Sequence, residues 1–177
     1  MSEAEILALL PALRRYARVL TGDSWAADDL VQDTLERACT RWRLWTAGSD
    51  LRAWLFTLMH NLHASQYRRA ARRSAIAPHL PLADVEAELV TPGAADALTL
   101  DLQRCLLQLP DEQRAVLLLV ALEGLSYAEA ARITGVAIGT VMSRLARARA
   151  RLDVLLHGDA ADQESPGARI VPLRRQS

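Results

Sequence analysis

The sequence lacks lysine altogether and contains one phenylalanine and two cysteines in 177 residues. Two cysteines far apart in the chain, Cys39 and Cys105, form neither a disulfide framework nor a paired metal motif. No apolar run reaches the roughly 18 residues that a membrane helix needs. The N-terminus is acidic first and basic later, the reverse of a signal peptide. These absences predict a cytoplasmic protein with no membrane insertion, no bound metal and no cofactor.

Residues that favour strands are scarce, and no stretch alternates between apolar and polar side chains. Alanine, leucine and arginine dominate instead, which favours helix. The predicted fold class is therefore all-α. The helices are expected over 3–20, with a break or restart at Pro11, and over 24–43, 51–73, 96–109, 111–124, 126–134 and 139–152.

The net charge of zero conceals blocks of opposite sign. Residues 76–103 carry five acids and no arginine, whereas residues 130–152 carry five arginines and no acid. The acidic stretch also contains three of the seven prolines and loses the helical pattern, which is typical of a linker. We therefore expect two small helical domains joined by a flexible linker, with these boundaries: first domain 1–74, acidic linker 75–96, second domain 97–157 and disordered tail 158–177.

The helix expected over 24–43 has an apolar face and an opposite polar face. Four side chains share the polar face at about 100° per residue: Asp29, Gln32, Asp33 and Glu36. Such a stripe is usually a solvated helix surface. Its alternative interpretation is a docking surface for a basic partner.

The helix expected over 51–73 begins after a loop, with Asp50 or Ser49 as its cap. It ends in a basic run that includes Arg68 and Arg69. His60 and His63 lie three residues apart and could ligate a metal, but no Cys, Asp or Glu is near them in sequence. We therefore interpret them as polar helix positions near DNA.

A helix-turn-helix motif is predicted in the second domain. Ser126 and Glu129 have the spacing of a capping box, in which each side chain binds the other residue's backbone amide. Gly135 follows the short helix and supplies a left-handed turn. Helix, glycine-containing turn and helix together are typical of a DNA-binding domain.

The last helix is expected to have a core face and a DNA face. The core stripe comprises Val141, Leu145, Ala148 and Leu152. The flanking exposed face comprises Thr140, Ser143, Arg144, Arg147 and Arg151. Arginine can bond guanine bidentately and hydroxyls can contact phosphate, so this face suits the major groove. We expect Arg144 to reach base edges and Arg151 to meet the DNA backbone.

Two motif sets together resemble a known family. ADDLVQDTLERA (27–38) with LRAWLFTLMHNLHASQYRR (51–69) is similar to sigma region two, and the stretch 109–152 is similar to sigma region four. In this order, joined by an acidic linker, they resemble a sigma-70-type factor of the extracytoplasmic-function (ECF) group. The stretches LTG, RAWLFT and SYAEAA resemble its general-stress-response members.

This resemblance implies an alternative sigma factor that binds core RNA polymerase, through the β′ clamp helices and the β flap, and directs it to promoter DNA. The polymerase contacts would fall on Asp29, Gln32, Asp33 and Glu36. The minus-ten element would be opened by Gly48, Ser49, Asp50, Trp54, Asn61, Ser65, Arg68 and Arg69. The helix over 139–152 would read the minus-thirty-five element. An anti-sigma factor is a further expected partner, and nucleoid association is expected in the holoenzyme.

Three alternatives remain at this stage. An enzyme is disfavoured because the sequence has no glycine-rich phosphate loop and no nucleophile motif. A sigma-like mimic that only titrates an anti-sigma factor would not need its DNA face. A plain helix-turn-helix regulator would not need residues 24–73.

Overall fold

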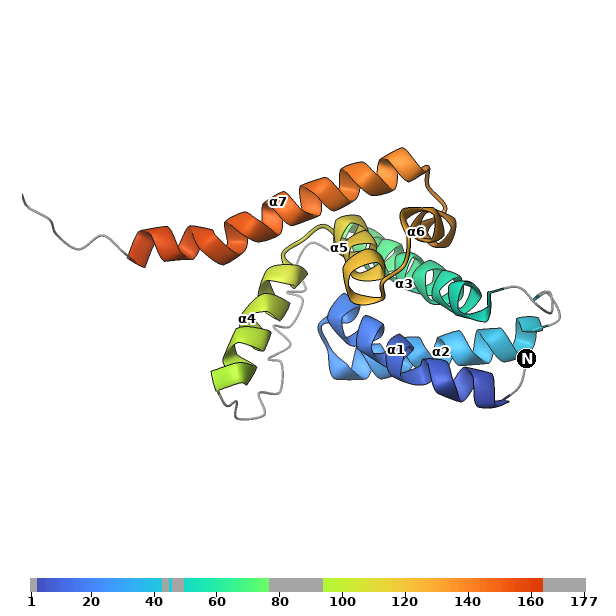
Figure 1. Ribbon diagram of the computed structural model, residues 1–177. Helices are drawn as coiled ribbons and strands as arrows, with labels where there is room; N and C mark the ends of the chain where they lie inside the picture. The colour runs from blue at the N-terminus through green and yellow to red at the C-terminus, as the bar shows by residue number, and fades with distance from the viewer. Residues whose placement is uncertain (1–2, 43–44, 46–49, 77–93, 164–177) are drawn as a thin grey trace, which may run out of the picture.

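The computed structural model describes residues 3–42, 45, 50–76 and 94–163, and these residues are helical apart from short connections (Figure 1). The all-α prediction is therefore confirmed. The expected linker lies mostly in 77–93, outside the described residues. None of the described helices is long and apolar enough to cross a membrane.

The first helical unit consists of α1 (Glu3–Thr21), α2 (Ser24–Arg41) and α3 (Leu51–Ile76). Helix α1 runs through Pro11 without interruption, so the predicted break there is wrong. Proline removes one hydrogen bond from the helix. The helix continues nevertheless, because the turns after Pro11 are packed against the core by three buried residues: Leu13, Tyr16 and Ala17. Asp23 caps α2, since its carboxylate accepts a hydrogen bond from the Ala26 amide at 2.6 Å.

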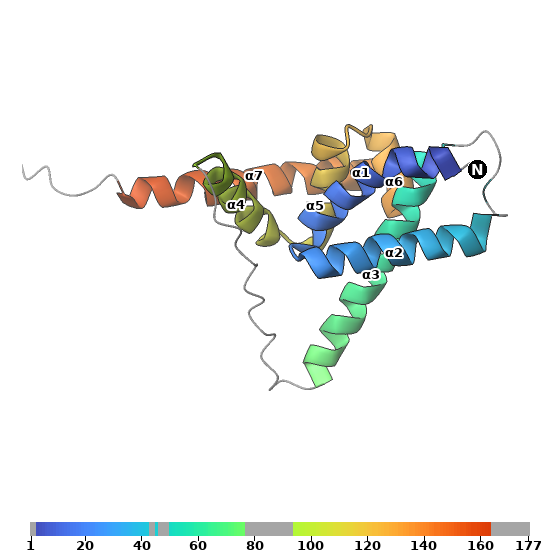
Figure 2. The same cartoon turned by 90° about the horizontal axis from the view of Figure 1, so that it is seen from below.

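The second unit contains α4 (Ala94–Leu107), α5 (Asp111–Leu117), the π-helical turn η2 (Leu118–Leu122), α6 (Tyr127–Thr134) and α7 (Ile138–Gln163). The expected helix over 111–124 is thus an α-helix that ends in a π turn. Helix α7 is long and projects away from the first unit (Figure 2). It continues six residues past the predicted boundary at His157, because no proline stops it before Pro166. Of the predicted tail, residues 164–177 lie outside the described residues.

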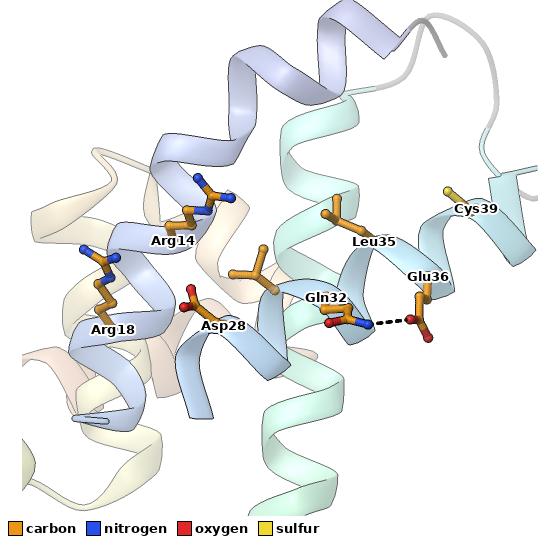
Figure 3. A pocket seen from close by; sticks show the side chains of 8 residues that line it. Arg14, Arg18, Asp28, Gln32, Leu35, Glu36 and Cys39 are labelled. Atoms are coloured by element: carbon orange, nitrogen blue, oxygen red, sulfur yellow. Dashed lines mark hydrogen bonds between the residues drawn. The ribbon is translucent and has the colours of Figure 1, made fainter. Parts of the chain in front are cut away.

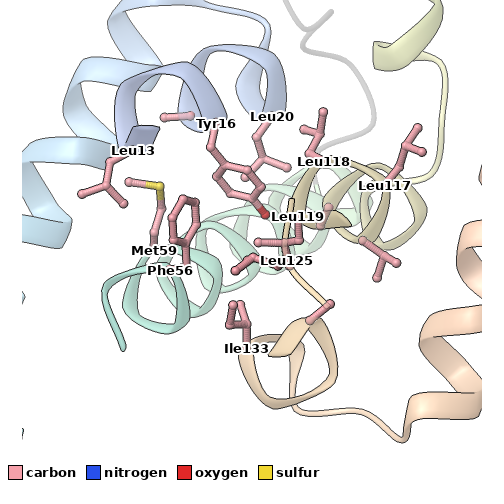
Figure 4. Close-up of a cluster of buried hydrophobic side chains, with 14 of the residues drawn as sticks. Leu13, Tyr16, Leu20, Phe56, Met59, Leu117, Leu118, Leu119, Leu125 and Ile133 are labelled. Carbon is pink, nitrogen blue, oxygen red and sulfur yellow. The ribbon is translucent and has the colours of Figure 1, made fainter. Parts of the chain in front are cut away.

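The two units are packed against each other over a continuous apolar core (Figure 4). Tyr16 of α1 and Phe56 of α3 meet edge to face, with ring centroids 5.3 Å apart. Side chains from the second unit complete this cluster: Leu118, Leu119, Leu125 and Ile133. The sequence predicted both units, and their association is a finding of the structure.

Candidate functional site

The helix-turn-helix forms as predicted. The Ser126 hydroxyl accepts a hydrogen bond from the Glu129 amide at 3.2 Å, and the Glu129 carboxylate accepts one from the Ser126 amide at 2.8 Å. The Ser126 side chain and backbone both donate to this carboxylate and hold the pKa of Glu129 below its usual range. Gly135 ends α6 at φ 69°, in the left-handed region. The local signals therefore set the start of α6 and the turn into α7.

Helix α7 presents the two predicted faces. Val141, Leu145 and Ala148 are buried and Leu152 is half-buried, so the core stripe is confirmed. On the other flank, Arg147 and Arg151 are exposed. Thr140 and Ser143 are half-buried, and the Ser143 hydroxyl donates to the Thr140 carbonyl at 3.0 Å. The most accessible groups of the candidate DNA face are therefore its two later arginines.

Arg144 differs from its neighbours on α7. Its guanidinium forms an ion pair with Glu112 at the start of α5, and its side chain is 20% exposed. This position of the expected exposed face is therefore half-buried and paired. The pair joins two helices of one unit, and Glu112 itself is 69% exposed. The pair therefore has one half-buried and one mostly exposed partner.

The four residues of the candidate polymerase surface on α2 differ in solvent exposure, although the sequence predicts one shared polar face. Asp29, Gln32 and Glu36 are exposed, and the Gln32 amide donates to the Glu36 carboxylate at 3.0 Å. Asp33 is half-buried and accepts a hydrogen bond from Gln66 of α3 at 3.2 Å. Asp33 therefore helps to hold α2 against α3, and three of the four predicted residues remain open to a partner.

A pocket of about 680 Å³ lies beside this surface, between α1 and α2 (Figure 3). Its α1 side carries Arg14 and Arg18, and its α2 side carries Asp28, Gln32 and Glu36. The pocket thus combines a basic and an acidic wall. The α2 sequence alone could not reveal this, because the arginines come from another helix.

The candidate minus-ten residues follow α3. Asp50 caps the helix, since its carboxylate accepts a hydrogen bond from the Ala53 amide at 3.1 Å. Three residues farther along lie on one face: the Ser65 hydroxyl donates to the Asn61 carbonyl at 2.7 Å, and Arg68 donates to Ser65 at 3.3 Å. Asn61, Arg68 and Arg69 are exposed, whereas Trp54 is half-buried against the core. Gly48 and Ser49 lie outside the described residues.

The two histidines of α3 do not lie on an open DNA surface. His63 is buried, and its Nε2 is 2.7 Å from a carboxylate oxygen of Asp111 in the second unit. Arg114 also binds that oxygen, at 3.0 Å. Burial alone would raise the pKa of Asp111, but the hydrogen bond and charge of His63, together with Arg114, hold it below its usual range. The signal for this role was the four-residue spacing Leu55, Met59, His63, which puts His63 on the apolar stripe.

His60 lies one turn earlier and is half-buried. Burial lowers the pKa of His60 to about 4, so the ring is neutral at pH 7. Its Nδ1 is buried with no hydrogen-bonding partner among the described residues. The described part of the chain contains no group of three or more side chains placed to hold a metal.

Glu123 is the residue that the sequence interpretation missed. Its side chain is fully buried and forms ion pairs with Arg15 of α1 and Arg52 of α3. The available signal was an acid inside the apolar run VALEGL, since buried carboxylates are almost always paired. The identity of its partners could not be read from the sequence.

Comparisons with known proteins agree with this arrangement. Residues 6–60 match the family described as the Sigma2 domain of PhyR, and residues 99–152 match Sigma-70, region 4. The chain is 41% identical to the ECF RNA polymerase sigma factor EcfG of Rhodopseudomonas palustris, over 92% of this chain and 88% of the relative. It is 38% identical to the ECF sigma factor SigM of Mycobacterium tuberculosis, over 81% and 71% of the two chains.

Solved structures show the same fold. The sigma factor RpoE of Bartonella quintana, in complex with the anti-sigma factor NepR, is 39% identical and superposes with a TM-score of 0.76, over 89% of this chain and 97% of that one. CnrH, in complex with the cytosolic domain of CnrY, is 28% identical with a TM-score of 0.66, over 88% and 87% of the two chains. Both relatives are therefore similar over nearly their whole length.

Proposed function

This chain belongs to the ECF sigma factors of RNA polymerase, and we propose that it divides its tasks between the α2 surface, the α3 face and helix α7. As an alternative sigma factor, the protein binds core RNA polymerase and directs promoter recognition and transcription initiation. The observation that carries the proposal is the pairing of a capped helix-turn-helix with exposed arginines on α7. A protein with this activity would act in the cytoplasm, and it would be associated with the nucleoid when it is part of the holoenzyme. We assign it no enzymatic role.

We assign reading of the minus-thirty-five element to Thr140, Ser143, Arg144, Arg147 and Arg151. Arg147 and Arg151 are exposed for phosphate or base contacts, and Arg144 would exchange its Glu112 contact for one with DNA. We assign the minus-ten element to Gly48, Ser49, Asp50, Trp54, Asn61, Ser65, Arg68 and Arg69. Support for this assignment is the row formed by Asn61, Ser65 and Arg68 on one exposed face of α3.

Core polymerase would dock on Asp29, Gln32 and Glu36, with Asp33 positioned through Gln66. We expect the double reversal Asp29→Arg with Glu36→Arg to weaken core binding at least tenfold, because both charges are exposed and would repel a basic partner. A salt-matched pull-down with core polymerase measures this. The control is Asp101→Asn with Arg104→Gln, which removes an exposed pair on α4. Wild-type affinity of the reversed protein would contradict the assignment.

An anti-sigma factor is the further partner, since RpoE and CnrH are seen in complexes with NepR and CnrY. A second candidate function is titration of such a factor without transcription. The match of residues 6–60 to the Sigma2 domain of PhyR favours it, because PhyR is itself an anti-anti-sigma factor.

Run-off transcription separates these two functions. Core polymerase is supplied with this protein on a panel of promoter fragments, and we expect specific transcripts that are absent with core alone. Arg147→Ala with Arg151→Ala should reduce them, because both arginines lie on the candidate DNA face. Binding to core and to an anti-sigma factor without any transcript would support the mimic instead.

A further inference from the structure

Helix α7 carries an uncharged strip on the side that faces away from the core. Helices α4, α5 and α6 pack against α7, and all three lie on one side of it (Figure 1). At about 100° per residue, the outer side lies roughly 100–200° around the helix from the buried Val141. Up to residue 150, four exposed residues occupy this sector, and none of them is polar: Gly139, Met142, Ala146 and Ala150. We refer to these four as the outer strip.

Arginines border the outer strip on both sides. Arg149 lies at about 80° from Val141, and Arg147 and Arg151 lie at about 240° and 280°. All three arginines are exposed and form no ion pair within the described part of the chain. The major groove of DNA has the same cross-section, since its floor of base edges runs between two phosphate backbones. With the arginines at the phosphates, the outer strip would face the base edges.

The first turns of α7 expose two large apolar side chains. Ile138 is 49% exposed and Met142, four residues later, is 53% exposed. No acidic residue lies in the first turn of the helix. In a helix-turn-helix, the N-terminal residues of the recognition helix are the ones that contact base edges. Ile138 and Met142 therefore lie at the end of α7 that would enter the groove.

Gly139 lies between these two side chains and is consistent with a close approach to DNA. A Cβ added at Gly139 would meet no packed neighbour within 4 Å. The fold therefore does not require a glycine here, although glycine is a poor helix former. A surface that comes close to the backbone of α7 in a complex would require one.

The chemistry of Met142 restricts what it can recognise on a base edge. A thioether donates no hydrogen bond and accepts only weakly, so it cannot bind the donors and acceptors that distinguish guanine, cytosine and adenine. The C5-methyl group of thymine is the apolar group in the major groove, and apolar side chains contact it. Methionine is also flexible enough to adapt its shape to such a contact.

We propose that Met142, with Ile138 beside it, reads thymine methyl groups in the minus-thirty-five element. The proposal rests on the proposed function for placing α7 in the major groove. It adds two specificity-determining residues to the arginines and hydroxyls already assigned to this element. Each methyl contact should contribute about fourfold to affinity, as expected when one methylene-sized apolar group is removed from water.

The experiment removes single methyl groups from the DNA. The full chain in complex with core polymerase first enriches a duplex from a pool that is randomised at the minus-thirty-five element. Each thymine of the enriched element is then replaced in turn by deoxyuridine, which lacks only the C5-methyl group. Competition binding measures the affinity of the complex for each duplex. We expect at least one replacement to lower the affinity of the unaltered protein about fourfold.

Variants of Met142 connect that loss to one side chain. With Met142→Ala the same replacement should change affinity by less than about twofold, because no apolar group then lies beside the methyl. Met142→Leu keeps an apolar side chain of similar volume and should retain the sensitivity. Val154→Ala is the matched control, since Val154 is 67% exposed on the same helix but lies outside the outer strip. Ile138→Ala tests the second contact in the same way.

Three results would overturn the methyl contact: no enriched sequence, no effect of deoxyuridine on the unaltered protein, or an equal effect in Met142→Ala and Ile138→Ala. Weaker binding of Met142→Ala to core polymerase, without any effect of deoxyuridine, would assign the outer strip to a protein contact instead. Run-off transcription keeps the proposed function separate. Absence of transcripts with a clear deoxyuridine effect would refute the role in initiation alone. Normal transcription without that effect would refute the methyl contact alone.

Discussion

Arginines occupy two opposite environments at helix α7 and at the π turn η2. On α7, Arg147 and Arg151 are exposed and have no ion pair within the described residues. At η2, Arg15 and Arg52 of the first unit converge on one buried carboxylate. Local helix geometry suffices to place the first pair, whereas the second depends on contacts 108 and 71 residues apart in sequence. The same residue type therefore lines a candidate nucleic-acid surface in one place and forms an internal contact in the other.

The largest expected effect is at the interface between the units. Leu119→Ala truncates a fully buried side chain of η2 and should lower the free energy of unfolding by about 2–5 kcal/mol, because it leaves a cavity in the core. Val154→Ala on exposed α7 should change it by no more than about 0.5 kcal/mol. Urea denaturation followed by circular dichroism measures both. Equal effects would show that the interface contributes no more to stability than the outer end of α7.

The interface should also respond to acid. The unfolded chain protonates His60 near its ordinary pKa of about 6.5, whereas the folded chain does so only at about 4. Between these values the unfolded state binds more protons, so the free energy of unfolding falls as pH falls from 6.5 to 4, by about 2–3 kcal/mol. The surrounding charges are Asp111, His63, Arg144 and Arg68, with Asp111 titrating lower still.

Urea denaturation at pH 7, 5.5 and 4.5 tests this pH dependence. His60→Gln should flatten the decline, because glutamine takes up no proton. The matched control is His157→Gln, since His157 is exposed on α7 and should leave the decline as it is. A decline that is identical in all three proteins would rule out His60 as its source.

The smallest expected effects lie on the DNA face. Arg144→Ala should cost about 1–3 kcal/mol at the cognate minus-thirty-five element and flatten the preference between sequences, because it would lose a base contact. Arg151→Ala should weaken binding to all sequences alike and lower the salt slope by about one, because it would lose a phosphate contact. Competition binding with single-base promoter variants at two salt concentrations measures both.

The Arg144 contact with Glu112 requires its own control in that assay. Glu112→Gln releases Arg144 without removing it and should leave sequence preference intact. If Arg144→Ala lowers binding to every variant equally, the residue contacts backbone and not bases. The distinction between the two ends of the α7 face would then disappear.

Much of the candidate site could be predicted because its signals are local. The capping box at Ser126, the left-handed Gly135 and the buried stripe of Val141, Leu145 and Ala148 each depend on residues within a few turns. Asp50 as the cap of α3 is another such case. Helical periodicity and hydrogen bonding between near neighbours are fixed by backbone geometry, so the sequence specifies them directly.

The expectations that the structure modifies depend on contacts between helices. Asp33 and His63 were assigned to outer surfaces, yet each binds a residue on another helix, Gln66 and Asp111 respectively. Arg144 is expected on an exposed face, and its side chain is 20% exposed and paired with Glu112. Each of these polar side chains can form hydrogen bonds either with water or with a residue of another helix. The sequence alone does not show which, because it does not show which helices pack together.

The sequence alone predicts an all-α protein with two sigma-like helical units, a capped helix-turn-helix and an arginine-rich last helix. The tertiary structure alone decided that these units close on each other, that Glu123 is buried between Arg15 and Arg52, and that His63 meets Asp111. The reason is physical. Periodicity in the sequence sets which face of a helix is apolar. Which of these faces pack together depends on the free energy of folding of the whole chain. A charged side chain can be buried in that packing only where an opposite charge lies beside it.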